Sequence, residues 1–367
     1  MDRNMKIIIS GGGSGGHIFP AIAIANALKE KGVKDILFVG ANGKIEMEKV
    51  PNAGYEIVGL NISGFHRRQM SRNLKFPFKL IGSLLKAKKI IDKFNPDVVV
   101  GVGGFASGPM LKLAQWKGIP TLIQEQNSYP GITNKLLAGK ADRICVAYDH
   151  MDSFFKEEKI LLTGNPVRKD LTNVEELRSE AYTHFDLDQN KKTLFIFGGS
   201  LGARSINNAI YNSRDVIKRF DNIQLIWQVG KLYHDEFKNS ELAQCPHVKI
   251  LPFIDRMDLA YSAADVIICR AGALTISELA IVGKPAIFIP SPNVAEDHQT
   301  KNAKALSEKD AALLIRDDEA KEKVIPTAIK LLEDKETQRS LSFNLKALAK
   351  PEAREAIANE VLKLVKS

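Results

Sequence analysis

A glycine-rich loop near the start of the chain constrains the fold more than any other segment. Residues 10–16 read Ser-Gly-Gly-Gly-Ser-Gly-Gly, and they lie between a short apolar run and a helical pattern that continues to Leu28. Gly11, Gly13 and Gly16 satisfy the spacing G-x-G-x-x-G, which lets backbone N–H groups approach a phosphate at the start of a helix. The segment therefore predicts a strand, a glycine loop and a helix.

Short apolar runs alternate with helical patterns along the whole chain. Such alternation predicts a parallel sheet with crossover helices. Residues 192–204 repeat the opening arrangement, because an apolar run is again followed by Gly-Gly-Ser-Leu-Gly. The chain has 367 residues, which is long enough for two domains. The repeat indicates two similar α/β domains with a ligand between them.

Composition limits the partners and the compartment. The net charge of +9 favours an anionic partner, which could be nucleic acid, an acidic membrane or a phosphorylated substrate. The three cysteines lack C-x-x-C spacing, so neither a disulfide framework nor a zinc site is indicated. We find no signal-peptide pattern and no uncharged apolar stretch of the roughly 18 residues that span a bilayer. We therefore expect a cytoplasmic protein with, at most, peripheral membrane contact.

A basic and apolar stretch, residues 65–91, allows three interpretations. It is either a core-facing amphipathic helix with a solvated basic side, or a surface that inserts apolar side chains into a bilayer while basic ones meet anionic head groups. Nucleic-acid binding ranks third, since no stacking-aromatic or helix-turn-helix pattern supports it. The basic residues in and just beyond the stretch are Arg67, Arg68, Arg72, Lys75, Lys79, Lys86, Lys88, Lys89 and Lys93.

The second predicted strand argues against a dinucleotide cofactor. Such a fold carries an acidic residue at the end of that strand to hold a ribose. Gly40 and Ala41 occupy this position, and Glu46 is the acid nearby that keeps the alternative open.

Polar residues at other strand ends are candidate ligand contacts. Glu125 and Asn127 end the predicted strand 121–127, and open α/β sheets bind ligands at such ends, although the two residues could equally begin a loop. Near Gly272 a glycine turn enters a helix, where Thr275 and Ser277 are of the types that cap. Glu278 is either a carboxylate favoured by the helix dipole or an acceptor for a ribose diol.

Six segments, in order over nearly the whole chain, resemble the motifs of the MurG family of bacterial UDP-GlcNAc transferases. They are residues 11–20, 103–109, 125–134, 164–168, 198–204 and 270–278. The resemblance implies a GT-B fold, in which two Rossmann-like domains face each other across a cleft. Residues 1–166 would bind the acceptor and the membrane, residues 167–344 would bind UDP-GlcNAc, and residues 345–367 would form a helix that packs back on the N-terminal domain.

The resemblance also implies the reaction. GlcNAc would move from UDP-GlcNAc to the 4-hydroxyl of MurNAc in undecaprenyl-pyrophosphoryl-MurNAc-pentapeptide, converting lipid I to lipid II with inversion and without metal or cofactor. The implied partners are UDP-GlcNAc, lipid I, other cell-wall enzymes and, through residues 65–91, the anionic cytoplasmic face of the cell membrane, but not nucleic acid. The alternatives are a UDP-GlcNAc 2-epimerase, another GT-B nucleotide-sugar enzyme, or a binding module without catalysis.

The donor and acceptor contacts are carried over residue by residue from this resemblance. Glu278 would hold the ribose hydroxyls, the backbone of Ile254 the uracil, and Arg168 the donor. The diphosphate would lie against Ser200, Ala273, Leu274, Thr275, Ile276 and Ser277. Asn127 and Gln299 would contact GlcNAc, and Ser14, Gly15 and Gly16 would form the N-terminal loop near the donor or the acceptor diphosphate.

His17 is the first choice for the general base, because an unperturbed imidazole titrates near pH 6.5 and can accept a proton at neutral pH. A structural or acceptor-positioning role for His17 stays open, and Glu125 is the second choice. Three further motif residues receive no role: Asn134, Asn207 and Arg270. The chain departs from better-known family members at Phe105, Gln124 and His298.

Overall fold

A computed structural model of the chain describes residues 5–64, 76–294 and 297–366. The chain forms two compact units: unit 1 consists of Met1–Val167 and Lys350–Ser367, and unit 2 of Arg168–Ala349. Each unit is built on a parallel sheet. The predicted fold class, α/β with two Rossmann-like domains, is confirmed.

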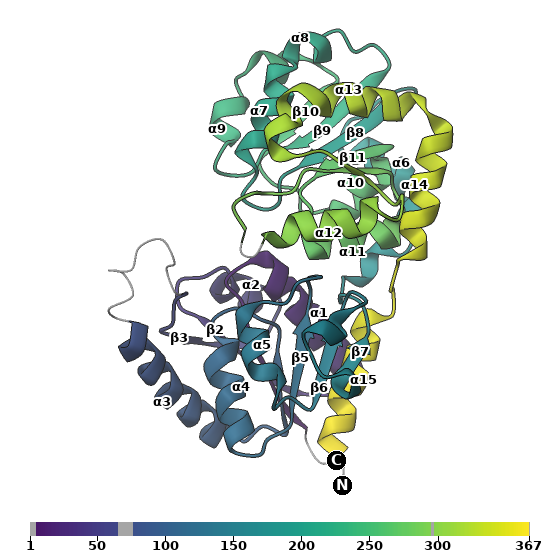
Figure 1. Ribbon diagram of the computed structural model, residues 1–367. Helices are drawn as coiled ribbons and strands as arrows, with labels where there is room; N and C mark the ends of the chain where they lie inside the picture. Colours follow the sequence, from purple (N-terminus) through teal and green to yellow (C-terminus); the bar gives the residue numbers. More distant parts are fainter. Residues whose placement is uncertain (1–4, 65–75, 295–296, 367) are drawn as a thin grey trace. The chain divides into compact units, whose positions relative to one another are not determined.

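Unit 1 contains a seven-stranded sheet in the order β3-β2-β1-β4-β5-β6-β7 (Figure 1). Its neighbouring strands pair in parallel. The chain order reverses between β1 and β4, and open α/β sheets bind ligands beside such a point. The strands are β1 (Lys6–Ser10), β2 (Asp35–Ala41), β3 (Glu56–Leu60), β4 (Val98–Gly101), β5 (Thr121–Glu125), β6 (Arg143–Val146) and β7 (Ile160–Leu162).

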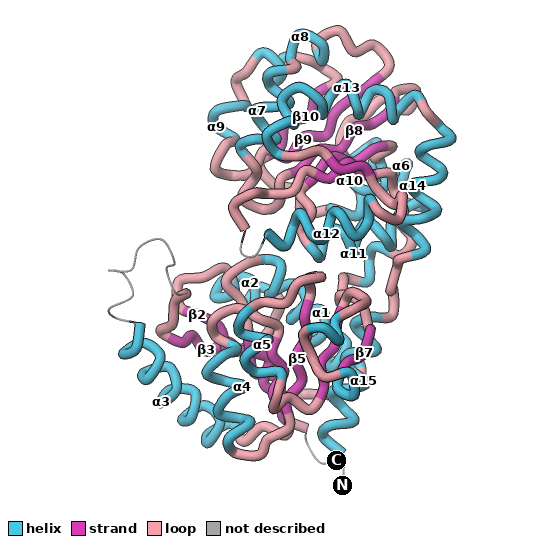
Figure 2. Tube along the Cα trace, in the orientation of Figure 1, coloured by secondary structure: helices cyan, strands magenta, loops and turns pink. Residues whose placement is uncertain are grey.

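Helices cover both faces of this sheet, as Figure 2 shows. Ile7 and Ile9 of β1 pack in the core beneath α1, α2 and α15, whereas Ile8 packs in the opposite core beneath α3, α4 and α5. Apolar residues at every position are typical of a strand buried on both faces. The helices are α1 (Gly15–Glu30), α2 (Glu46–Asn52), α3 (Phe76–Phe94), α4 (Ser107–Trp116), α5 (Ile132–Ala138) and α15 (Ala353–Lys366).

Helix α15 belongs to unit 1 although it follows unit 2 in the chain. Its residues Ile357 and Val361 are fully buried in one core with Ile24 of α1. Arg354, at the start of α15, donates a hydrogen bond to Glu30 Oε2 at 2.8 Å. The core of unit 1 therefore includes a helix that the chain contributes last.

Unit 2 contains a six-stranded sheet in the order β10-β9-β8-β11-β12-β13. Trp227 of β9 is fully buried in its core. The strands are β8 (Lys192–Phe197), β9 (Ile223–Gln228), β10 (Val248–Leu251), β11 (Val266–Cys269), β12 (Ala286–Phe288) and β13 (Leu313–Leu314). The helices are α6 (Arg178–His184), α7 (Arg204–Asn212), α8 (Arg214–Ile217), α9 (His234–Phe237), α10 (Met257–Ala263), α11 (Ala273–Val282), α12 (His298–Ser307), α13 (Ala320–Glu333) and α14 (Lys335–Ala347).

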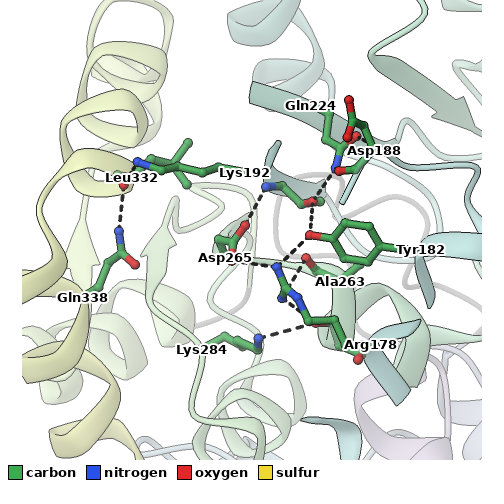
Figure 3. Close-up of polar contacts among 12 residues, drawn as sticks. Arg178, Tyr182, Asp188, Lys192, Gln224, Ala263, Asp265, Lys284, Leu332 and Gln338 are labelled. Atoms are coloured by element: carbon green, nitrogen blue, oxygen red, sulfur yellow. Dashed lines mark hydrogen bonds and ion pairs between the residues drawn. The ribbon is translucent and has the colours of Figure 1, made fainter. Parts of the chain in front are cut away.

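A polar network fastens α6 to the sheet of unit 2 (Figure 3). Arg178 donates to Tyr182 Oη at 2.7 Å and to Asp265 Oδ1 at 3.1 Å. The other oxygen of Asp265 accepts the backbone N–H of Thr193 at 2.7 Å. Lys284 lies nearby, and its burial lowers the pKa of its ammonium group. These contacts tie α6 to β8 and to the residue before β11.

The sequence patterns do not predict two of the strands, β6 and β13. β6 has four residues and β13 has two, and β6 begins at a charged residue after the polar segment Lys140–Asp142. Such short runs carry no measurable period. Within the described ranges, no helix has both the length and the apolar character needed to cross a bilayer.

Candidate active site

The glycine loop of unit 1 is held by a buried carboxylate. Glu46, at the start of α2, is fully buried. Its Oε2 accepts the backbone N–H of Gly13 at 2.8 Å, and its Oε1 accepts that of Ala41 at 2.9 Å. The sequence leaves Glu46 open as a possible ribose ligand, but its carboxylate points into the protein interior. This geometry argues further against a dinucleotide site in unit 1.

His17 lies in the first turn of α1 and is half-buried. Its Nδ1 is 2.9 Å from Oε1 of Gln126. The imidazole packs against Gly103, where a Cβ would stand 3.0 Å from Cε1 of the ring. Gly103 also has a φ of +88°, a conformation that favours glycine. The glycine segment that follows β4, residues 101–104, therefore leaves the space that the imidazole fills.

Glu125, at the end of β5, is buried and saturated with hydrogen bonds. Its Oε1 accepts the backbone N–H of Asn127 at 3.0 Å and the side-chain Nδ2 of Asn127 at 3.2 Å. Its Oε2 accepts the N–H of Gly131 at 3.1 Å and Nδ2 of Asn134 at 2.8 Å. Donors from residues 127–134 therefore occupy both oxygens of this carboxylate. The geometry favours a loop-ordering role for Glu125 and Asn134.

Helix α11 of unit 2 begins without a side-chain cap. Gly272 is its N-cap residue, and no side-chain hydrogen bond caps the helix. Ser277 instead donates to the carbonyl of Ala273 at 3.0 Å. The expectation that Thr275 or Ser277 caps this helix is therefore wrong. The N-terminus of this helix carries the positive end of the helix dipole, which suits the predicted diphosphate contact at residues 273–277.

Glu278 follows in the same helix, where it is partly buried. Tyr261, which is fully buried, donates its hydroxyl to Glu278 Oε2 at 2.8 Å. Burial raises the pKa of Glu278, while the positive charge of Arg168 and the Tyr261 hydrogen bond act in the opposite direction. Arg168 itself lies 3.4 Å from Asp170. The carboxylate of Glu278 thus has a buried hydroxyl donor, Tyr261, and the positive charge of Arg168 acts on it.

A buried glutamine joins two other predicted donor contacts. Gln228, at the end of β9, accepts the backbone N–H of Ile254 at 2.8 Å and donates to the carbonyl of Gly199 at 3.1 Å. Gly199 precedes Ser200 in the glycine loop, and Ile254 lines a pocket of about 360 Å³ together with Phe253. Gln228 therefore couples the glycine loop to the segment expected to hold uracil.

Gln299 and two motif residues without an assigned role have clear contacts. Gln299, in α12, accepts the backbone N–H of Ser291 at 2.8 Å, so its amide nitrogen is directed elsewhere. Asn207 donates to the carbonyl of Val229 and accepts from Trp227. Arg270 donates to Asp317, Ser205 and the carbonyls of Ile289 and Pro290. Asn207 therefore stabilises the segment after β9, and Arg270 stabilises the segment after β12.

Each unit gathers its predicted contacts at the carboxyl ends of its own strands. In unit 1 these residues follow β1 and β5, and they are Ser14, Gly15, Gly16, His17, Glu125 and Asn127. In unit 2 they follow β8, β10, β11 and β12, apart from Arg168 at the start of the unit, and they are Ser200, Ile254, Ala273, Leu274, Thr275, Ile276, Ser277, Glu278 and Gln299. Over the part of the chain that the structure describes, no cluster of three or more His, Cys, Asp or Glu side chains is placed to hold a metal.

Comparison with known proteins identifies the family. The glycosyltransferase family 28 N-terminal domain matches residues 7–146, and the C-terminal domain of that family matches residues 193–359. The chain belongs to glycosyltransferase family 28. A relative from Flavobacterium psychrophilum is 56% identical over 99% of this chain and 98% of its own length. It is named UDP-N-acetylglucosamine--N-acetylmuramyl-(pentapeptide) pyrophosphoryl-undecaprenol N-acetylglucosamine transferase.

Solved structures agree with this family 28 assignment. The crystal structure of Acinetobacter baumannii MurG is 27% identical with a TM-score of 0.76, and the match covers 98% of this chain and 99% of that one. The UDP-GlcNAc 2-epimerase of Neisseria meningitidis bound to UDP-GlcNAc has a TM-score of 0.69 at 14% identity, over 98% of this chain and 100% of that one. The second likeness shows the fold alone. The family resemblance predicted from the motifs is confirmed.

Three side chains at the candidate site of this family 28 chain are not singled out by the sequence. They are Gln126 beside His17, Gln228 beside Ile254, and Tyr261 beside Glu278. Gln126 lies inside a quoted motif, which is a usable signal. Gln228 and Tyr261 lie outside every motif and contact residues 26 and 17 positions away, so only the fold reveals them.

Proposed function

We propose that this protein transfers GlcNAc from UDP-GlcNAc to the 4-hydroxyl of MurNAc in undecaprenyl-pyrophosphoryl-MurNAc-pentapeptide, converting lipid I to lipid II. One observation carries the proposal: the F. psychrophilum relative named for this reaction matches this chain from end to end at 56% identity. The side chains needed for the reaction are also present in both units. His17 stands at the first glycine loop, and in unit 2 the positive charge of Arg168 acts on the carboxylate of Glu278.

Unit 2 supplies the donor contacts in this proposal. The carboxylate of Glu278 accepts the ribose hydroxyls, and the carbonyl of Ile254 accepts the N3–H of uracil, since the Ile254 N–H already binds Gln228. The diphosphate lies against Ser200 and residues 273–277, at the positive end of the α11 dipole. Gln299 offers its amide nitrogen to GlcNAc, because its oxygen is held by Ser291.

Unit 1 supplies the acceptor chemistry. His17 removes the proton from the 4-hydroxyl of MurNAc as that oxygen attacks C1 of GlcNAc, and the bond from C1 to the diphosphate oxygen breaks on the opposite side. UDP leaves as an anion. The N-terminus of α11 and the guanidinium of Arg168 stabilise the charge that develops on the diphosphate. We prefer His17 to Glu125, whose oxygens accept four hydrogen bonds.

The same proposal places unit 1 on the anionic cytoplasmic face of the membrane through the stretch 65–91. In α3 one face is in the core, since Ala87 and Ile91 are buried, and another exposes Phe78, Ile81 and Leu85. Part of the basic character is used within the protein, because Lys86 donates to the carbonyl of Gly59 at 2.7 Å. Four of the predicted head-group contacts lie outside the described residues, namely Arg67, Arg68, Arg72 and Lys75.

One assay tests the reaction against its alternatives. Purified protein is given radiolabelled UDP-GlcNAc and a short-chain lipid I analogue, and we expect a labelled disaccharide lipid and free UDP. Release of epimerised sugar with no labelled lipid would support the epimerase instead. Tight UDP-GlcNAc binding with neither product would support the third alternative, a binding module without catalysis.

The membrane contact is tested separately with vesicles rich in anionic lipid. The charge-reversal variant Arg67→Glu/Arg68→Glu/Lys75→Glu and the apolar variant Phe78→Ser should both reduce co-sedimentation, with transfer to a soluble acceptor analogue unchanged. Leu162→Ser is the matched control, because Leu162 is an exposed apolar residue of β7, outside this stretch. Full vesicle binding by both variants would contradict the proposed surface.

A further inference from the structure

Three buried carboxamides form a chain of hydrogen bonds that ends at His17. Asn165, Gln124 and Gln126 are at most 2% exposed. Asn165 donates through Nδ2 to the backbone carbonyl of Gln126 at 3.0 Å, and Gln124 donates through Nε2 to Asn165 Oδ1 at 3.0 Å. Gln126 donates through Nε2 to Gln124 Oε1 and to the carbonyl of Val102, the latter at 2.9 Å. Oε1 of Gln126 then faces His17 Nδ1 at 2.9 Å.

Backbone carbonyls at both ends fix the orientation of these amides. A carbonyl oxygen only accepts hydrogen bonds, so the nitrogen of Gln126 must face Val102, and the nitrogen of Asn165 must face the backbone of Gln126. Turning either amide over would set two buried oxygens against each other, an arrangement that buried polar groups avoid. The oxygen of Gln126 is therefore the atom that points at the imidazole.

An amide oxygen that faces a ring nitrogen selects one form of the histidine. Since Oε1 of Gln126 can only accept, Nδ1 of His17 carries the hydrogen. In a neutral imidazole with a hydrogen on Nδ1, Nε2 has none and is the basic atom. The same ring fills the space that a Cβ at position 103 would need, 3.0 Å from Cε1.

We propose that Gln126, oriented by Gln124 and Asn165, is the positioning residue that holds neutral His17 with its proton on Nδ1, so that Nε2 takes the proton of the acceptor hydroxyl. This inference rests on the proposed transfer reaction. In serine hydrolases a carboxylate orients the histidine and also stabilises its charged form. Gln126 orients the ring without adding a negative charge.

The tautomer is measured directly by long-range proton–nitrogen correlation NMR on the full chain with isotope-labelled histidine. The His17 signals are assigned from their loss in His17→Gln. We expect the Nδ1–H pattern for His17, which is informative because exposed histidines favour Nε2–H. An Nε2–H pattern for His17 in the wild-type protein would overturn the inference, even if the protein transfers GlcNAc normally.

Two substitutions at Gln126 separate positioning from general structure. Gln126→Leu keeps the size of the side chain but lacks the acceptor, so kcat should fall about 10- to 100-fold, the range found when the hydrogen-bond partner of a functional histidine is removed, with the KM for UDP-GlcNAc unchanged. Gln126→Glu restores an acceptor, but its second oxygen replaces the nitrogen that donates to the carbonyl of Val102. That oxygen needs a proton to donate, so the side chain stays neutral and kcat should return toward the wild-type value. A matched control is Gln115→Leu, because Gln115 in α4 donates to the carbonyl of Leu137 away from His17.

The outcomes distinguish this inference from the proposed function. Absence of transfer by the wild-type protein would defeat the function, and the tautomer measurement would still report on the contact between Gln126 and His17. Normal kcat in Gln126→Leu would defeat the inference alone. If the Gln126 variants do not fold, the wild-type tautomer decides.

Discussion

The glycine loops of the two units, residues 11–16 and 198–202, follow the first strand of their sheets, and each packs against a glycine of a neighbouring loop. A Cβ on Gly104 would stand 2.2 Å from the carbonyl oxygen of Gly12, and a Cβ on Gly230 would stand 2.4 Å from the N atom of Gly202. The groups that hold the loops differ, because the buried carboxylate of Glu46 binds the first loop and the neutral amide of Gln228 binds the second.

In the proposed reaction, this difference would let one sequence pattern serve two purposes. A carboxylate at Gly13 takes an N–H group that a phosphate would otherwise bind, and its charge disfavours a second anion beside it. The first loop is therefore best suited to carry His17 at a fixed position. The second loop has a neutral amide behind it and Arg168 in the same unit, and both features suit a diphosphate. The predicted effects should accordingly divide between kcat in unit 1 and donor binding in unit 2.

The largest effect is expected at the first loop. His17→Ala should lower kcat by about 100- to 10,000-fold, the usual contribution of a general base, with the KM for UDP-GlcNAc unchanged. His150→Asn serves as the control, because His150 is exposed and has a φ of +59° that asparagine tolerates. Near-normal turnover of His17→Ala would contradict a catalytic role for the first loop. The expected division between kcat effects in unit 1 and donor-binding effects in unit 2 would then not hold.

The next effect is expected in unit 2. Glu278→Gln should raise the KM for UDP-GlcNAc about 10- to 100-fold, because hydrogen bonds to a charged group contribute about 1.5–3 kcal/mol, while kcat changes little. Glu241→Gln is the control, since Glu241 is an exposed carboxylate of the same unit that pairs with Lys218. An unchanged KM in Glu278→Gln would contradict the ribose role.

Glu278 also gives a stability test with a defined sign. Its pKa in the folded protein is raised by burial, so folding favours the protonated form. The stabilisation from this protonated carboxyl is present at low pH and is lost as pH rises from the ordinary range of a glutamate through the raised pKa. Glu278→Gln should therefore have a higher Tm than the wild-type protein at neutral pH, with the difference shrinking on acidification. A Tm difference that grows toward low pH would contradict this cause.

A smaller effect tests the buried carboxylate itself. Glu46→Gln replaces one acceptor oxygen with a donor that faces a backbone N–H group, so the free energy of unfolding should fall by about 1–3 kcal/mol. Glu48→Gln, on the exposed side of the same helix, should change it by less than about 0.5 kcal/mol. Denaturant unfolding measures both. Equal stability of the two variants would show that the first loop does not depend on the carboxylate.

The smallest effect is expected at Gln228. Gln228→Met keeps the volume but leaves the Ile254 N–H and the Gly199 carbonyl without this partner. The donor KM should rise about 3- to 10-fold, equivalent to roughly 1 kcal/mol, while kcat is retained. Gln244→Met is the control, because Gln244 lies in the short helix 241–244 outside the site. A loss in kcat instead of donor binding would place Gln228 with the catalytic side.

Local patterns predict much of the fold, whereas the hydrogen-bond partners come from the fold itself. The sheets follow from buried apolar runs such as Lys6–Ser10, and the loops from glycines with fixed spacing. Glu46 shows the limit, because it lies near the position of a ribose acid without occupying it, and only the fold reveals its contacts with Gly13 and Ala41. The pairing of Asn165 with Gln124 joins residues 41 positions apart, and no local pattern encodes it.

The placement of α15 in unit 1 has a consequence for the order in which the protein is made. The ribosome synthesises all of unit 2, residues 168–349, before it reaches the helix that completes the core of unit 1. During translation, the apolar side chains of α1 around Ile24 therefore lack their packing partners Ile357 and Val361 until the end of the chain is made. Unit 2 can finish folding first, and the segment that emerges earliest is among the last to become fully stable.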